Sequence, residues 1–195
     1  MRQCVIGGYD MRIIAGAWRG RVLVAPPGQA TRPTSERMRQ ALFDMLAHAP
    51  WAEGVLHQAR VLDAFAGTGA LGLEALSRGA AHAAFLETDR GALAALRANI
   101  SACKAGDRTT VMAASAIAAP RAAQGSACSL VFLDPPYGQA LVPRAVQALL
   151  QAGWIAPSGL IVAETGTDET LGLHASLVAE RQHGAARTSF WRMPG

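Results

Sequence analysis

Residues 60–72 read RVLDAFAGTGALG, and this stretch decides the predicted fold. Its apolar start is typical of a buried strand, which we predict over 60–65. The glycines at 67, 69 and 72 form a G-x-G-x-x-G motif that leads into a helix. Glycine allows a positive φ and a close backbone approach, so the amino end of such a helix can hold the polar groups of a ligand.

The chain beyond this motif alternates between strand-like and helix-like segments. Strands joined by helices of about 10–15 residues need crossover connections, so we expect a mostly parallel sheet that is covered on both faces. We therefore predict an α/β, Rossmann-like fold with a seven-stranded sheet that ends in an antiparallel hairpin. The other predicted strands are 82–87, 109–113, 129–133, 160–164, 177–180 and 188–192, and the helices are 70–78, 90–103, 141–152 and an alanine-rich segment after 113.

A basic segment precedes this domain. Two apolar stretches predict a short strand pair over 11–24, and Thr34 or Ser35 can cap a helix that follows. Helical spacing leaves Arg37 and Arg39 off the apolar face of that helix. The residues of the predicted apolar face are Met38, Leu42, Met45 and Leu46.

The composition excludes several classes of protein. Hydrophobic residues make up 51% and charged residues 16% of the 195 residues, which is typical of a globular chain and not of a disordered one. No apolar run reaches the ~18 residues of a membrane span, and the three cysteines form no C-x-x-C pair. We expect a cytoplasmic monomer without a bound metal, with a disordered extension at 1–10, a basic segment at 11–50 and the main domain at 51–195.

The net charge of +4 is unevenly distributed. Residues 1–40 carry seven arginines against Asp10 and Glu36, a local charge of +5, whereas the other 155 residues sum to −1. This asymmetry indicates a polyanion partner that binds this end, because neutralising phosphates releases counterions. A solvated basic face without a partner explains the charge equally well, so both interpretations stay open.

Two carboxylates indicate what the glycine turn binds. Glu87 ends the next predicted strand, 18 residues after Gly69, where a carboxylate can accept hydrogen bonds from both hydroxyls of a ribose. Asp63 lies four positions before Gly67, which suits a cofactor that carries a cationic amino-acid group and no pyrophosphate. These features favour S-adenosylmethionine over a nicotinamide dinucleotide, with a cap on the following turn as the structural alternative for Asp63.

A second motif, Asp134-Pro135-Pro136-Tyr137, follows an apolar strand 71 residues after Asp63. D-P-P alone is a turn, but here it lies at the carboxyl edge of the predicted sheet, where α/β folds bind ligands. The prolines make the backbone rigid, so Asp134 and a proline carbonyl can both accept hydrogen bonds from one exocyclic amine. Tyr137 offers a flat face on which a base can stack.

This arrangement predicts methylation of an aromatic amine. The lone pair of such an amine is delocalised into the ring, and two acceptors that hold its hydrogens would aim it at a sulfonium methyl group. Orientation and electrostatics would provide most of the rate, with Asp134 also available as a proton acceptor. Because the amine of a stacked base is inaccessible, the target must be flipped out or unpaired.

The glycine turn together with D-P-P-Y resembles the class I methyltransferases that modify exocyclic amines of nucleobases. Further matches narrow the resemblance to the bacterial RsmD family, which methylates N2 of a guanine in 16S ribosomal RNA. The stretches that carry it are MRIIAGAWRG at 11–20, TRPT at 31–34 with Arg37, Arg39 and Phe43, DAFAGTGALGLEALSRGA at 63–80, and DPPY at 134–137. The TRPT segment singles out this family, and the resemblance runs from residue 11 to about 164 and more faintly to the end.

The resemblance implies roles for three groups of residues. The target guanine would be held by the catalytic residues Asp134, Pro135, Pro136 and Tyr137. The cofactor, S-adenosylmethionine, would be bound by Asp63, Phe65, Gly67, Thr68, Gly69, Glu87 and Ser115. Many relatives carry Asn or Asp near Ser115 to bind the adenine, so this chain departs from the family there. The 16S rRNA, in the small ribosomal subunit or an assembly intermediate, would contact Arg12, Arg19, Arg21, Arg32, Thr34 and Arg37.

Three other functions stay open at this point. DNA adenine-N6 and cytosine-N4 methyltransferases use the same D-P-P-Y, but they usually carry a target-recognition domain for which 195 residues leave little room. A NAD-dependent oxidoreductase would share the glycine turn, and a non-catalytic RNA-binding assembly factor would need neither Asp134 nor Tyr137. Ten residues precede Met11, where the family usually starts, which indicates an upstream start codon or a disordered extension.

Overall fold

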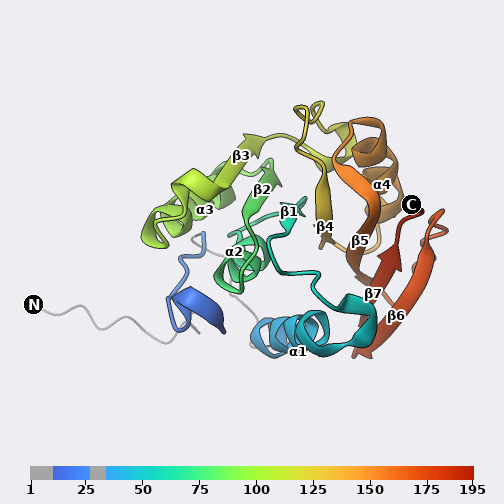
Figure 1. Cartoon of the computed structure of the whole chain (residues 1–195), viewed down its shortest axis with the longest axis horizontal. Coiled ribbons are helices and arrows are strands. Elements are labelled where there is room, and N and C mark those ends of the chain that lie inside the picture. The colour runs from blue at the N-terminus through green and yellow to red at the C-terminus, as the bar shows by residue number, and fades with distance from the viewer. Residues whose placement is uncertain (1–10, 27–33) are drawn as a thin grey trace, which may run out of the picture.

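The computed structural model describes residues 11–26 and 34–195, which form a twisted central sheet with helices on both faces (Figure 1). The order of the seven strands across the sheet is β3-β2-β1-β4-β5-β7-β6. Neighbours from β3 to β5 are parallel, whereas β7 is antiparallel to both β5 and β6. This confirms the predicted α/β fold with a mostly parallel sheet and a C-terminal antiparallel hairpin.

The elements lie close to the predicted ranges. The strands are β1 (Arg60–Asp63), β2 (His82–Glu87), β3 (Thr109–Ala113), β4 (Cys128–Leu133), β5 (Ile155–Gly166), β6 (Ser176–His183) and β7 (Ala186–Arg192). The helices are α1 (Thr34–His48), α2 (Ala70–Ser77), α3 (Arg90–Ala102) and α4 (Leu141–Gln151), with short 3-10 turns η1 (Gly16–Trp18), η2 (Pro50–Ala52), η3 (Gly106–Arg108) and η4 (Ala116–Ala118).

The parallel strands are buried on both faces because successive side chains point to opposite sides. Val61 and Phe132 belong to the core cluster that includes side chains of α1, α2 and α3. Leu62 and Val131 belong to the cluster on the other face, which α4 covers. Near-continuous apolar runs in β1 and β4 are therefore what this sheet requires.

Three predictions about local structure are wrong. The strand pair expected over 11–24 forms only one bridge, between Arg12 and Val22, because η1 interrupts the ribbon. The alanine-rich helix expected after β3 shrinks to η4. Arg39, expected off the buried face of α1, is only 5% exposed. Its Nη2 donates to the carbonyl oxygen of Arg12 at 2.6 Å, so the buried guanidinium connects α1 to the N-terminal segment.

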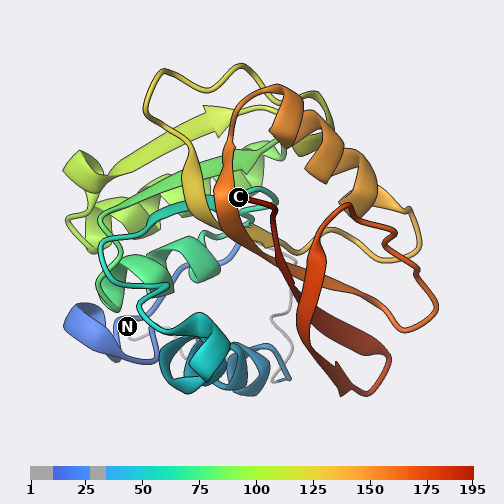
Figure 2. The same cartoon turned by 45° about the vertical axis from the view of Figure 1, so that its right-hand side comes forward.

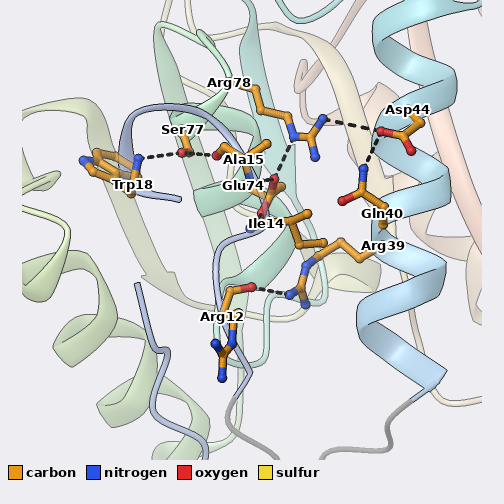
Figure 3. A network of polar contacts seen from close by, with 10 residues as sticks. All are labelled: Arg12, Ile14, Ala15, Trp18, Arg39, Gln40, Asp44, Glu74, Ser77 and Arg78. Atoms are coloured by element: carbon orange, nitrogen blue, oxygen red, sulfur yellow. Dashed lines mark hydrogen bonds and ion pairs between the residues drawn. The ribbon is translucent and has the colours of Figure 1, made fainter. Parts of the chain in front are cut away.

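The N-terminal segment is attached to the domain by buried polar side chains (Figure 3). Glu74 of α2, which is fully buried, accepts hydrogen bonds from the backbone N–H groups of Ile14 at 2.7 Å and Ala15 at 3.0 Å. Ser77, one turn further along α2, accepts from the N–H of Trp18 and donates to the carbonyl of Ala15. Leaving any of these buried groups without a partner would destabilise the fold, so the segment has a defined position.

The carboxyl ends of the parallel strands face α1. Figure 2 shows α1 and the turn between β6 and β7 at the same end of the sheet. Phe43 of α1 packs against Phe132 of β4, with ring centroids 5.7 Å apart. The predicted boundary between residues 50 and 51 stays a prediction, although side chains from both sides of it share one hydrophobic cluster.

Candidate active site

Four carboxylates end four neighbouring strands. Glu87 ends β2, Asp63 ends β1, Asp134 follows β4 directly, and Glu164 lies near the end of β5. In the strand register, Asp63 is opposite Phe132 of β4, and Leu133 is opposite Ala163 of β5. Asp134 and Glu164 therefore occupy adjacent positions at the same edge. The two motifs thus lie at the ends of neighbouring strands, β1 and β4.

A pocket of about 600 Å³ opens at this edge. Asp63, Asp134 and Glu164 line it together with the glycine turn, and Tyr137 lines it with 43% of its surface exposed. Residues far away in sequence complete the wall: Met11 and Ala25 of the N-terminal segment, Met38, Arg39 and Leu42 of α1, and His183–Ala186 with Thr188 of the hairpin. The pocket thus combines the two motifs with elements from both ends of the described chain.

The three glycines of the turn have different roles. Gly67 has a φ of +52°, lines the pocket, and would place an added Cβ in open space, with nothing within 4 Å. Gly69 has a φ of +80°, and a Cβ there would lie 2.3 Å from Cδ1 of Leu96. A Cβ at Gly72 would lie 2.4 Å from the Phe85 ring. Gly67 therefore leaves room for a ligand, whereas Gly69 and Gly72 allow close packing of α2.

Asp63 is both a cap and a pocket residue. Its Oδ2 accepts the N–H of Gly72 at 3.0 Å, which satisfies a donor in the first turn of α2 that Gly69 has no side chain to reach. Burial raises the pKa of Asp63 to about 7; the hydrogen bond from Gly72 opposes this rise, and the charge of Glu87 adds to it. A cation placed against this carboxylate would remove much of the penalty for ionising it.

Glu87 holds the glycine turn in position. Its Oε2 accepts the N–H of Gly67 at 2.7 Å, and its Oε1 accepts from the N–H groups of Thr88 and Asp89. Of the other residues predicted to bind the cofactor, Phe65 and Thr68 line the pocket, and Thr68 Oγ1 contacts Sδ of Met11 at 3.5 Å. Glu87, Gly69 and Ser115 lie outside the lining, and Ser115 is half-buried between β3 and η4.

The D-P-P-Y turn is fixed from β5. The hydroxyl of Tyr137 donates to Oε1 of Glu164. Glu169, which lies beyond β5, accepts the N–H of Gly138 at 2.9 Å. Pro135 is buried and Pro136 is exposed, and neither lines the pocket. The tyrosine is therefore held at the pocket by its hydroxyl.

The carboxylates also affect one another. Desolvation by the surrounding protein, together with the charges of Glu164 and Asp63, raises the pKa of Asp134 to about 8. Asp134 also lines the open pocket and is exposed there, so water moderates the rise. An acid whose pKa lies near neutrality is suited to take up a proton during a reaction at neutral pH.

The residues predicted to bind RNA lie apart from the pocket lining where they are described. Arg12, Arg19, Arg21 and Arg37 are all exposed. Arg12 is 4.0 Å from Glu36, and Arg21 donates to the carbonyl of Ala102 at 2.6 Å. Arg32 is outside the described residues, as is the predicted extension at 1–10, and the side chain of Thr34 is not described.

Sequence reasoning missed Glu164 and the pocket residues from α1 and the hairpin. Position at the end of a strand was the available signal for Glu164, since the same criterion identifies Asp63 and Asp134. No such signal exists for Met38 or Thr188, because their approach depends on tertiary packing.

Among the described residues, no helix combines the length and apolar character needed to cross a membrane. No cluster of three or more His, Cys, Asp or Glu side chains within 11–26 and 34–195 could hold a metal ion.

The model of the family described as conserved hypothetical protein 95 matches residues 11–192. Ribosomal RNA small subunit methyltransferase D of Escherichia coli K12 is 39% identical over 165 residues, 85% of this chain and 79% of that protein. The Haemophilus influenzae protein of the same name is 37% identical over 164 residues, 83% of this chain and 82% of its own length.

Solved structures of similar proteins share this fold. A candidate methyltransferase of Escherichia coli has a TM-score of 0.81 at 37% identity, covering 95% of this chain and 98% of that one. A candidate methylase of Haemophilus influenzae has a TM-score of 0.75 at 32% identity, covering 95% and 99%. The predicted class I methyltransferase fold is thereby confirmed.

Proposed function

Because the chain belongs to the family described as conserved hypothetical protein 95, we propose that it transfers a methyl group from S-adenosylmethionine to the exocyclic N2 of a guanine in 16S ribosomal RNA. Two of its relatives, 39% and 37% identical, are named ribosomal RNA small subunit methyltransferase D. The observation that carries the proposal is the pairing of β1 with β4, which brings Asp63 and the D-P-P-Y turn to one pocket.

The pocket has the chemistry that this cofactor needs. Asp63 is a buried carboxylate that lines the pocket, and because burial raises its pKa, a positive charge beside it would favour its ionised form. The ammonium group of the cofactor would provide that charge, while Gly67 and Phe65 would contact it from the glycine turn. Glu87 would share its carboxylate between the N–H of Gly67 and the ribose. When bound, S-adenosylmethionine supplies an electrophilic methyl group on a sulfonium.

The residues of the chain would act on the amine. Asp134 and a proline carbonyl of the D-P-P-Y turn would accept its two hydrogens, which directs the nitrogen lone pair toward the cofactor side of the pocket. Tyr137 would stack on the base. As positive charge develops on the nitrogen, the Asp134 carboxylate would stabilise it and take up the proton. The pKa of Asp134 is raised, which makes its carboxylate a stronger base and favours this role.

The RNA would lie across the basic N-terminal segment. Arg12, Arg19, Arg21 and Arg37 are exposed and available to phosphates, and the target base must leave its stack to reach Asp134. We propose that the substrate belongs to the small ribosomal subunit or an assembly intermediate, and that the protein works in the cytoplasm as a monomer.

Small ribosomal subunits from cells that lack the gene would test this proposal. The purified protein with S-adenosylmethionine should methylate one guanine at N2, located by mass spectrometry of nuclease fragments, and Asp134→Ala should abolish transfer. Methylation of DNA alone would point to the DNA methyltransferase alternative. Binding of NAD without S-adenosylhomocysteine would favour an oxidoreductase, and full methylation in cells by Asp134→Ala would favour an assembly factor.

A further inference from the structure

Glu164 is the pocket carboxylate that neither the sequence motifs nor the proposed chemistry uses. It is half-buried, lines the pocket, and occupies the position next to Asp134 across the β4–β5 pair. We propose that Glu164 selects guanine by accepting the N1–H of the same base whose N2 amine is held by Asp134. This inference rests on the proposed function, because it concerns the base that enters the pocket.

The edge of guanine explains why a second carboxylate would be useful. Its N1–H and N2 amine are neighbouring donors on one side of the ring. Adenine and cytosine have a ring nitrogen next to their amine that is an acceptor. Two adjacent carboxylates would therefore pair with guanine, whereas adenine or cytosine would bring a lone pair against one of them. A site that is built to hydrogen-bond a donor strongly rejects analogues that lack this donor.

The other carboxylates of the described pocket lining are already assigned. Asp63 is 2% exposed and accepts the N–H of Gly72, so it faces the glycine turn. Asp134 belongs to the motif that would hold the amine. Glu164 is left, and it lies on the opposite side of Asp134 from Asp63, because β4 runs between β1 and β5. The strand order therefore separates a cofactor carboxylate from a base carboxylate.

Tyr137 orients Glu164 for this role. Its hydroxyl donates to Oε1 of Glu164, and a carboxylate has further lone pairs with which to accept from a base. The same tyrosine would stack on the base, so a single side chain would set both the plane of the base and the position of the acceptor at its edge. Glu164 is thus a specificity-determining residue and Tyr137 its positioning residue.

The first test changes the substrate and leaves the protein intact. Small subunits would be reconstituted with 16S rRNA that carries guanine, 1-methylguanine or 2,6-diaminopurine at the target position. All three bases have the N2 amine, but only guanine has N1–H. We expect kcat/KM to fall at least ~100-fold for both analogues. Equal rates with all three bases would overturn the inference, whereas no transfer to guanine would instead refute the proposed function.

The second test changes the acceptor. Glu164→Gln can donate to the N1 acceptor of 2,6-diaminopurine, so the preference for guanine over this analogue should fall by ~100-fold or more relative to the wild type. A purely structural residue would lower both rates together and leave their ratio unchanged, which would contradict our assignment. Asp168→Asn is the matched control, because Asp168 is exposed and outside the pocket lining; it should keep the wild-type ratio.

Discussion

Replacing Asp63 by asparagine should separate stability from cofactor binding. The amide oxygen can still accept the N–H of Gly72, but the variant cannot ionise at this position. In the wild type, burial raises the pKa of Asp63 from its ordinary value of 3.8 to about 7. The protonated form is then favoured by folding, so its contribution to stability is complete below pH ~4 and is lost as the pH rises through 7.

The magnitude follows from the size of the rise. A rise from 3.8 to about 7 corresponds to about 4 kcal/mol when the group is fully ionised, because one pKa unit is worth about 1.4 kcal/mol. Between pH 5 and pH 8 about 2–3 kcal/mol of this would be lost in the wild type and not in Asp63→Asn. Cofactor binding should change in the opposite sense, with a loss of ~10–100-fold in affinity for S-adenosylmethionine because a charge partner is gone.

Urea unfolding of the ligand-free proteins at pH 5, 6, 7 and 8 would measure this. The stability of Asp63→Asn relative to the wild type should grow with pH by the stated amount, and calorimetry should show the weaker binding. Asp107→Asn is the control, since Asp107 is exposed and should give a difference that does not vary with pH. If the wild type and Asp63→Asn have parallel stability profiles, the buried carboxylate does not have the raised pKa on which the cofactor argument relies.

Four other variants test separate parts of the structure. Gly69→Ala should destabilise the fold by about 2–3 kcal/mol in chemical denaturation, because the added Cβ would clash with Leu96 and the residue has a positive φ. Gly67→Ala should lower the stability by only about 1 kcal/mol and should mainly weaken cofactor binding. Equal losses of stability in the two variants would contradict the different roles of these glycines. Glu74→Gln should destabilise the fold by about 2–4 kcal/mol, because a carboxylate that accepts two backbone N–H groups is replaced by an amide that is in part a donor. A change in stability under about 0.5 kcal/mol would show that the position of the N-terminal segment does not depend on Glu74. A variant with alanine at Arg19, Arg21 and Arg32 should lower the slope of log Kd for RNA against log salt by about 2–3, which filter binding can measure. Its affinity for S-adenosylhomocysteine, measured by calorimetry, should be unchanged. An unaltered slope would show that these arginines do not contact the RNA.

One side chain connects the basic segment to the cofactor turn. Asn99 of α3 is fully buried; its Oδ1 accepts the N–H of Val24 at 2.7 Å, and its Nδ2 donates to the carbonyls of Val24 and Thr68. Val24 belongs to the N-terminal segment and Thr68 to the glycine turn. Asn99 therefore links the backbone of the N-terminal segment to the backbone of the glycine turn.

The regular part of the fold was open to prediction from the sequence because its signals are local. Apolar runs that fill both faces of a sheet, together with glycines and prolines that end elements, identified β2 and β3 to the residue. Where the sequence signals were weak or mixed, the predicted structure was wrong. The N-terminal ribbon depends on acceptors supplied by Glu74 and Ser77 from α2, and the burial of Arg39 depends on a carbonyl 27 residues away.

The residues of the candidate site also divide into those that local sequence patterns identify and those that only tertiary packing brings together. Asp63, Gly67 and the D-P-P-Y turn could be found in the sequence, because each has a residue pattern that the chemistry requires at the end of a strand. The adjacency of Asp134 and Glu164 could not, because two residues 30 positions apart become neighbours only when β4 pairs with β5 in one particular register. Local patterns thus determined which groups are present. The pairing of β4 with β1 and β5 decided that Asp63, Asp134 and Glu164 share a pocket, because that pairing is set by long-range packing of the sheet.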